Sequence, residues 1–170
     1  KTGELRHTFQ GHTQQVNAIA VSQDGQYVVS ASNDCTLRQW KLASINQPAD
    51  IPTTTDWVNS LVPIDGQSVI SASRNSLRVW GAESSAEHRI LAKCSEDIYI
   101  RSVALTPDCL CVVSGSSDGT IHIRDIKSSN VCRTFQAHPE RVYSVAVTPD
   151  GHKIISASQD KTLKVWDLVT

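Results

Sequence analysis

The chain has 170 residues, of which 39% are hydrophobic and 19% are charged, and its formal net charge at pH 7 is −1. Lysine and arginine occur singly rather than in runs, which argues against a basic surface for nucleic acid or for a membrane. No apolar stretch approaches the roughly 20 residues of a membrane-spanning helix, and no signal-peptide pattern opens the chain. Because the five cysteines lack the dense spacing of a secreted disulfide framework, we expect a soluble, cytoplasmic protein.

One short motif occurs four times, each time preceded by a second apolar run and a turn. The first serines of the four copies follow one another at steps of 41, 43 and 42 residues. A period near 42 indicates one small unit used repeatedly. The chain contains no methionine and ends at a repeat boundary, so we expect it to be a segment of something longer. It is predicted to be one repeat segment, 1–170, with repeats at about 1–42, 43–81, 82–126 and 127–169.

In chain order, the first repeat places an apolar run at 16–25 before the motif at 28–40, and both runs are predicted to be strands joined by a turn. Residues 45–56 follow, with two prolines and no clear period, and are either an irregular edge strand or a loop. The second repeat has its two runs at 58–66 and 69–80. The strand–turn–strand order therefore resumes after the irregular segment.

The third repeat has its runs at 100–109 and 112–124, and the fourth repeat shows the strands most clearly. Its runs are rich in β-branched residues and alternate with period two. Tight turns are predicted at Asp150-Gly151 and at Asp160. A four-stranded sheet of this size cannot cover both of its own faces, so neighbouring sheets must stack on it as propeller blades do. The predicted strands of the last repeat are 130–137, 141–147, 152–158 and 162–168.

Several motifs resemble the WD40 repeat β-propeller family. They are Gly11-His12, the SASND sequence at 30–34 and, above all, the stretch 138–167. The resemblance covers the whole chain and is most specific in the first and fourth repeats. It implies an all-β fold of four blades with four antiparallel strands each. These blades would form part of a seven- or eight-bladed ring, or two copies would join into an eight-bladed ring.

The second and third repeats depart from the family pattern. Both lack the motif histidine. The second repeat has Asn75 in place of the turn aspartate, and the third has Cys109 in place of the turn glycine and Arg124 in place of the tryptophan. These two blades are expected to fold but to be held less stiffly.

The resemblance also implies how the strands are shared. In the family each repeat begins with the outer strand of one blade and continues with the three inner strands of the next. Residues 4–10 should therefore pair with a blade whose inner strands lie elsewhere, either in strands 141–167 of one closed ring, in missing sequence or in another copy.

In each complete blade the resemblance implies a hydrogen-bonded network of histidine, serine, aspartate and tryptophan. A buried histidine needs a partner for each ring nitrogen, and an indole N–H needs an acceptor, so such a network is chemically consistent. The remaining histidines, His7, His88, His122 and His152, are expected to face solvent. The network residues are His12, Ser30, Asp34 and Trp40 in the first repeat, and His138, Ser156, Asp160 and Trp166 in the fourth.

A serine, a histidine and an aspartate also describe a hydrolase triad. A catalytic triad is needed once, at an exposed pocket, whereas this trio recurs at the repeat period beside structural tryptophans. The GxGxxG, P-loop and HExxH motifs do not occur in the sequence, and the single match to GxSxG, at 115–119, lies inside the repeated motif. We therefore expect no enzymatic activity, no cofactor and no metal, and we interpret the Cys109-Leu110-Cys111 sequence as two unrelated thiols.

Twelve further positions are placed by the repeat alignment on one rim, the face that the family calls the top. The set is rich in aromatic residues and arginine, which are enriched at binding hot spots. Trp57 stands out because the other three tryptophans share one structural position. Packing between blades is the alternative role for Trp57 and the tyrosines. The rim residues are Gln15, Asn17, Asn33, Trp57, Asn59, Arg74, Tyr99, Arg101, Ser117, Arg141, Tyr143 and Gln159.

The sequence therefore predicts a non-catalytic protein-interaction scaffold, which binds other proteins and associates with itself or with the remaining blades of its parent chain. One alternative is a regulatory or sensor region of a larger signalling NTPase of the NACHT or NB-ARC type. Another is a reader of modified histone tails, ubiquitin or nucleic acid, although the rim is basic and aromatic where such a reader favours an acidic or aromatic cage.

Overall fold

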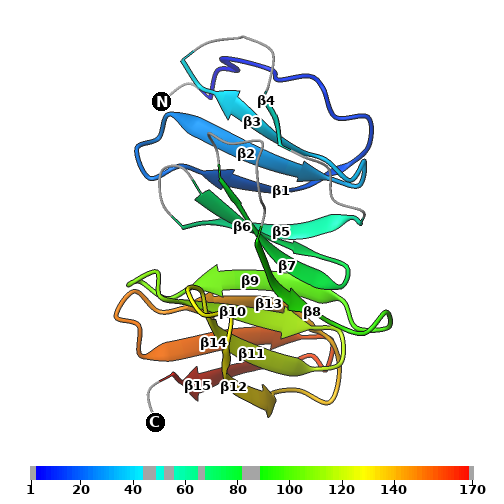
Figure 1. Ribbon diagram of the computed structural model, residues 1–170, viewed down its shortest axis with the longest axis vertical. Helices are drawn as coiled ribbons and strands as arrows, with labels where there is room; N and C mark the ends of the chain where they lie inside the picture. The colour runs from blue at the N-terminus through cyan, green and yellow to red at the C-terminus, as the bar shows by residue number, and fades with distance from the viewer. Residues whose placement is uncertain (1–2, 44–48, 52–55, 65–67, 82–88, 169–170) are drawn as a thin grey trace.

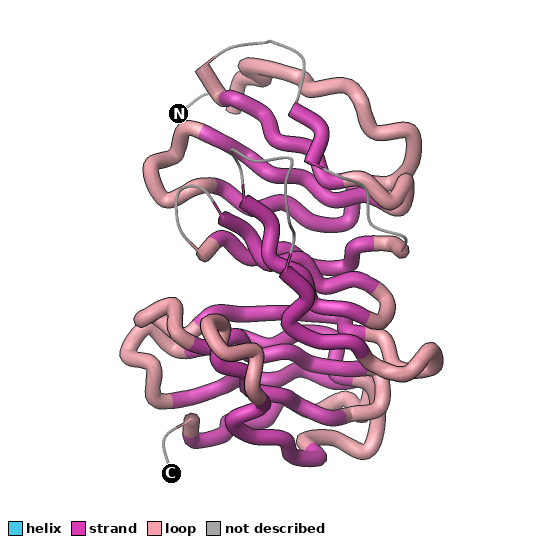
Figure 2. Tube along the Cα trace, in the orientation of Figure 1, coloured by secondary structure: helices cyan, strands magenta, loops and turns pink. Residues whose placement is uncertain are grey.

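The structure is a computed structural model that describes residues 3–43, 49–51, 56–64, 68–81 and 89–168. These residues form strands, turns and loops, and no helix able to cross a membrane is found among them (Figure 2). Fifteen strands are described, and they assemble into four antiparallel sheets that follow one another along the chain (Figure 1). The predicted all-β fold with four blade-like sheets is confirmed.

The strands of each sheet pair in chain order. The first sheet contains β1 (Val16–Val21), β2 (Tyr27–Ser32), β3 (Leu37–Lys41) and β4 (Ala49–Ile51). The second contains β5 (Val58–Pro63), β6 (Ser68–Ser73), β7 (Ser76–Gly81) and β8 (Arg89–Lys93). The third contains β9 (Ile100–Leu105), β10 (Cys111–Ser116), β11 (Thr120–Asp125) and β12 (Val131–Gln136). The fourth contains β13 (Val142–Val147), β14 (Lys153–Ser158) and β15 (Leu163–Asp167).

The outer strand of a sheet comes from the following repeat. The strand predicted at 130–137 forms as β12, but it pairs with β11 of the third sheet and not with the strands of the fourth. A tight turn causes the pairing, since the Asp125 N–H donates to the Asn130 carbonyl and Ser129 takes a positive φ of 63°. The expectation of four strands in the last sheet is therefore wrong for the described residues, which give it three.

Of two other segments that the sequence analysis singled out, 45–56 contains a strand and 4–10 does not. Within 45–56, Ala49–Ile51 forms the short edge strand β4 of the first sheet, and residues 45–48 and 52–55 lie outside the described part. Residues 4–10 are described but form no strand. The outer-strand position that the family pattern gives to residues 4–10 is therefore unpaired in one copy of the chain.

An aspartate closes the turn between the first two strands of a sheet. In the third sheet, Asp108 accepts hydrogen bonds from the Thr106 hydroxyl and from the N–H of Leu110. The residue after it, Cys109, has a φ of 56°, a left-handed conformation that favours glycine. Cys109 thus occupies the turn-glycine position, as the sequence indicated. In the first and fourth sheets the same position is glycine, in Asp24-Gly25 and Asp150-Gly151.

Apolar side chains fill three buried layers, one between each pair of neighbouring sheets. Between the first and second sheets, Leu37 and Ala31 lie in one cluster with Val58 and Leu61. The second layer combines residues of the second and third sheets, and the third layer those of the third and fourth. Because every layer needs two sheets, each sheet depends on its neighbour for a core.

Candidate partner-binding rim

A polar network lies beside the first sheet. His12 Nε2 is 2.7 Å from Ser30 Oγ, and His12 Nδ1 is 2.9 Å from a carboxylate oxygen of Asp34. The indole N–H of Trp40 donates to the same serine oxygen at 2.8 Å. The structure thus brings together the four residues that the sequence selected in the first repeat.

The fourth sheet carries the same network. His138 lies 2.7 Å from Ser156 Oγ through Nε2 and 2.7 Å from Asp160 through Nδ1, and the Trp166 indole donates to Ser156 at 2.9 Å. His138 follows β12 of the third sheet directly in the chain. The network therefore ties the outer strand of the third sheet to the inner strands of the fourth.

Neither network is built to catalyse. Ser30 and Ser156 are 5% and 0% exposed, so a substrate has no access to either hydroxyl. Each serine oxygen also accepts an indole N–H, from Trp40 or from Trp166. A nucleophile must be exposed at a pocket, and these hydroxyls are structural partners instead.

Hydrogen bonds keep the network aspartate charged. Burial alone would raise the pKa of Asp34, but hydrogen bonds from Thr36, from the Thr13 backbone and from His12 outweigh it and hold the pKa well below the ordinary value of 3.8. Thr36 donates through both its hydroxyl, at 2.6 Å, and its N–H, at 2.9 Å. The ionised carboxylate is thus the form that the folded chain stabilises.

The second and third sheets keep only parts of the network. Trp80 still donates to Ser71 at 2.7 Å in the second sheet. In the third sheet the serine position is the buried Ser114, and Arg124 stands where the tryptophan would be. His122 contradicts the expectation of a solvent-facing side chain, because it is partly buried and its Nδ1 lies 2.8 Å from the Thr134 hydroxyl; burial lowers the pKa of His122.

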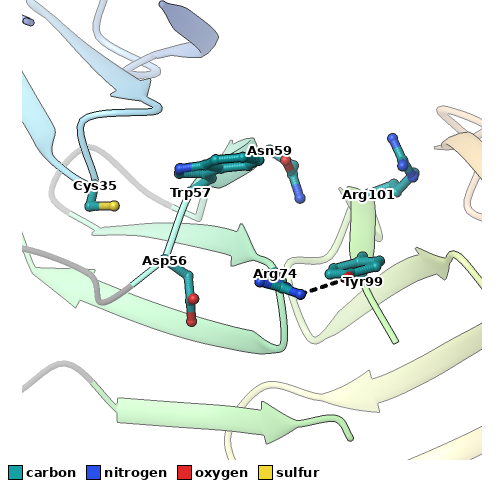
Figure 3. Close-up of a pocket in the computed structure, with 7 residues that line it drawn as sticks. All are labelled: Cys35, Asp56, Trp57, Asn59, Arg74, Tyr99 and Arg101. Atoms are coloured by element: carbon teal, nitrogen blue, oxygen red, sulfur yellow. Dashed lines mark hydrogen bonds between the residues drawn. The ribbon is translucent and has the colours of Figure 1, made fainter. Parts of the chain in front are cut away.

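The twelve predicted rim residues lie at one end of the sheets, where the first strand of each sheet begins and the second strand ends. Five of them line a single pocket of about 550 Å³, to which the second sheet and its flanking loops contribute most (Figure 3). Repeat alignment did not indicate the two other lining residues. One, Asp56, immediately precedes Trp57, and the other lies in the turn after β2. The pocket is lined by Cys35, Asp56, Trp57, Asn59, Arg74, Tyr99 and Arg101.

Two of the pocket residues contact each other, and a third has an exposed side chain. Arg74 donates to the Tyr99 hydroxyl at 2.7 Å, and its guanidinium carbon lies 4.8 Å from the centre of the tyrosine ring. Trp57 is 60% exposed, unlike the network tryptophans. An arginine held over an aromatic ring is positioned in advance, so the pocket presents an oriented cation beside an open indole face.

Arg101 extends the pocket towards the fourth sheet. Its guanidinium carbon lies 5.5 Å from the centre of the Tyr143 ring, and the Tyr143 hydroxyl is 3.4 Å from Gln159. The Nε atom of Arg101 is shielded from solvent and has no hydrogen-bond partner among the described residues. The Tyr143 ring thus helps to hold the Arg101 guanidinium at the rim.

The remaining rim residues hold the sheets and loops together. Asn17 donates to Asn33 at 2.6 Å and to the Val58 carbonyl of the next sheet at 3.1 Å, and Asn59 donates to the Ile100 carbonyl at 3.0 Å. Asn17 and Asn59 thus each join one sheet to the next through a hydrogen bond. Ser117 accepts the Tyr99 N–H, while the backbone carbonyls of Gln15 and Arg141 accept the N–H groups of Asn33 and Gln159.

A family comparison decides the assignment. The model described as "WD domain, G-beta repeat" matches residues 3–41, 86–125 and 129–167, which is more than half of the chain. The chain belongs to the WD40 family. The matches leave out the whole of the second repeat, 43–81, where the motif histidine and the turn aspartate are missing. WD40 domains generally bind proteins and are usually non-catalytic.

Curated WD40 relatives are much longer than this chain. Pre-mRNA-processing factor 19 of Caenorhabditis elegans is 29% identical over 141 residues, covering 78% of the chain and 27% of the relative. Apoptotic protease-activating factor 1 of Danio rerio is 26% identical over 133 residues, covering 78% of the chain and 10% of the relative. The chain thus spans about a quarter or less of these proteins.

Two solved structures share the WD40 fold of the chain. The Cps50 (Swd1) beta-propeller domain of Myceliophteria thermophila superposes with a TM-score of 0.87 at 12% identity, covering 97% of this chain and 56% of that one. The computationally designed Ika4 protein superposes with a TM-score of 0.81 at 25% identity, covering 99% of this chain and 100% of that one. The curvature of the four sheets is therefore that of propeller blades.

Proposed function

We propose that the chain is a non-catalytic platform whose rim pocket holds a segment of a partner protein. The observation that carries the proposal is the convergence of the exposed Trp57 indole with Arg74 and Arg101 in one pocket. Tryptophan, tyrosine and arginine dominate binding energy at interfaces because they combine a large apolar area with directed polar groups. The other three tryptophans donate to buried serines, whereas Trp57 is free to meet a ligand.

The charges in the pocket favour an acidic segment with an apolar neighbour. The lining of the pocket contains two guanidinium groups, those of Arg74 and Arg101, and one carboxylate, that of Asp56. A carboxylate of the partner would accept charge-assisted hydrogen bonds from the guanidinium groups of Arg74 and Arg101. An aromatic or aliphatic side chain next to it would cover the Trp57 indole.

Peptide binding tests this proposal directly. The probes are two fluorescein-labelled peptides, acetyl-Gly-Glu-Phe-Glu-Gly and the same peptide with glutamine in place of glutamate. Fluorescence anisotropy should give a Kd at least about tenfold lower for the acidic peptide, because the glutamine peptide lacks the charge that pairs with arginine. Trp57→Ala and Arg101→Gln should each weaken binding of the acidic peptide by about 2 kcal/mol, roughly thirtyfold.

Matched controls separate the pocket from general charge and apolarity. Arg6→Gln removes one exposed positive charge and Leu110→Ala removes an apolar side chain that is 61% exposed, and neither residue lines the pocket. Both controls should bind the acidic peptide like the wild type. Equal affinity for the two peptides, or unchanged binding by Trp57→Ala, contradicts the proposal.

The regulatory alternative has one specific observation in its favour, the similarity to a relative named as an apoptotic factor. The similarity to a pre-mRNA-processing factor is of the same size, so the comparison supports a shared WD40 domain more than a shared role. The sequence of the complete gene decides between the two functions, because a P-loop module in the same polypeptide would favour regulation of an NTPase.

A further inference from the structure

The charged side chains that line the rim pocket are divided between two ends. Figure 3 shows Asp56 and Trp57 on one side of the pocket and Arg74, Tyr99 and Arg101 on the other. The first group directly precedes β5, whereas the second lies in the turn after β6 and around the start of β9. We call the first group the acidic end of the pocket and the second group its basic end.

A second carboxylate adds to the negative charge of the acidic end. Cys35 also lines the pocket and lies next to this end (Figure 3). Burial raises the pKa of the Cys35 thiol, and the charges of Asp56 and Asp34 raise it further. The Asp34 side chain is only 6% exposed and is held in the network around His12, so it acts through its charge and not by contact. A ligand at this end would therefore contact Asp56 and Trp57 in a potential made negative by two carboxylates.

The tyrosines of the basic end orient two guanidinium groups without neutralising them. Arg74 donates to the Tyr99 hydroxyl at 2.7 Å, and the guanidinium carbon of Arg101 lies 5.5 Å from the centre of the Tyr143 ring. A tyrosine hydroxyl or ring carries no compensating negative charge, so these contacts position the cations and leave their charge in place. The basic end is thus suited to a carboxylate, which would accept charge-assisted hydrogen bonds.

The opposite charges of the two ends limit what can fill the pocket. A segment with acidic side chains alone would place one carboxylate beside Asp56, where like charges repel. A segment with basic side chains alone would place a cation beside Arg74 or Arg101 at the other end. A segment with one side chain of each sign pairs with both ends, so electrostatic complementarity favours it over either uniform segment.

The exposed indole of Trp57 suits a basic side chain at the acidic end. This indole is 60% exposed, and Trp57 follows Asp56 directly in the chain. Lysine and arginine pack their apolar stems on such a surface while the charged head reaches a polar group beyond it. A cation over an indole face is also attracted by the electrons of the ring. One basic side chain can therefore use Trp57 and Asp56 together.

We propose that the segment bound in the rim pocket carries a basic side chain at the acidic end and an acidic side chain at the basic end. This pairing rests on the proposed function, because it concerns the same pocket, and it adds a contact of opposite sign to the acidic one. An apolar residue between the two charged residues completes the segment by covering the rest of the Trp57 indole.

Fluorescence anisotropy with labelled peptides tests the basic contact. The probes are acetyl-Gly-Lys-Phe-Glu-Gly and acetyl-Gly-Glu-Phe-Lys-Gly, each compared with the same peptide in which glutamine replaces lysine. In at least one of the two orders, lysine should lower the Kd about fivefold, the gain expected of one partly exposed ion pair. The order with the larger gain gives the direction of the bound segment. If lysine lowers the Kd in neither order, the proposal is overturned.

Two variants locate the lysine contact. Asp56→Asn keeps the size of the side chain and removes its charge, so the lysine and glutamine peptides should bind this variant with the same Kd. Glu4→Gln removes an exposed carboxylate that does not line the pocket, and the gain from lysine should persist. The urea midpoint of each variant checks its fold, and the comparison of peptides on the wild type needs no variant. A gain that survives in Asp56→Asn, or that disappears in Glu4→Gln, overturns the proposal.

A failure of the charge pairing is distinguishable from a failure of the proposed function. If Trp57→Ala weakens binding of acetyl-Gly-Glu-Phe-Glu-Gly while lysine gives no gain in either order, the platform function stands and the pairing at Asp56 is wrong. If Trp57→Ala binds acetyl-Gly-Glu-Phe-Glu-Gly like the wild type, the proposed function itself is contradicted.

Discussion

The sheets at the two ends of the chain and the two sheets between them are held by different forces. The second and third sheets contribute to two apolar layers each, while the first and fourth contribute to one. The end sheets instead carry the complete networks around His12 and His138. The comparison teaches that a sheet of this chain packs on its neighbour whether or not it carries the complete polar network.

The end and middle repeats also differ in what they contribute to the rim pocket. Four of its cationic and aromatic residues, Trp57, Arg74, Tyr99 and Arg101, belong to the second and third sheets. These are the repeats that depart from the family motif. The repeats with the weakest structural pattern thus supply the cationic and aromatic side chains of the pocket.

The largest effect is expected from the apolar layer between the middle sheets. Leu77 is fully buried there, and Leu77→Ala should lower the free energy of unfolding by about 3–4 kcal/mol, since the cavity forms between two rigid sheets. Urea denaturation followed by circular dichroism measures the loss. Val131→Ala, at an apolar position that is 47% exposed, is the control and should change stability by less than about 0.5 kcal/mol. Similar losses for both variants would contradict the role given to this layer.

The repeat period, the strand order and the end networks could be predicted from the sequence because each rests on spacing that recurs. Residues such as Ser30 and Ser156 superpose at the repeat step, so their shared role is visible in the letters. The sharing of β12 with the third sheet depends instead on the turn geometry after Asp125. The pocket needed the structure, because Asp56 and Cys35 come close to Arg101 only when the sheets stack.

The second largest effect is expected from the polar networks of the end sheets. His138 is 1% exposed, and His138→Ala removes the contacts of its two ring nitrogens with the Ser156 hydroxyl and the Asp160 carboxylate. Unfolding should become easier by roughly 2 kcal/mol. The comparison in the middle sheets is Asn75→Ala, which changes the position of the turn aspartate in a repeat without the network histidine and should cost less than about 0.5 kcal/mol. Equal shifts in the urea midpoint would show that the two regions are not held differently.

The smallest effect is a difference in acid stability that belongs to the first network. The pKa of Asp34 is held below its ordinary value of 3.8, so the unfolded chain takes up this proton at a higher pH than the folded chain. Asp34 therefore stabilises the fold above pH 3.8, and the contribution is lost as the pH falls below that value. Between pH 5 and pH 3 the wild type should lose more free energy of unfolding than Asp34→Asn, because the asparagine does not titrate. Other aspartates with lowered pKa titrate in both proteins, so their contributions cancel in the difference; they are Asp24, Asp108, Asp125, Asp150 and Asp160. Urea unfolding of both proteins at pH 5, 4 and 3 measures it, and parallel curves would mean that the Asp34 carboxylate does not stabilise the first sheet.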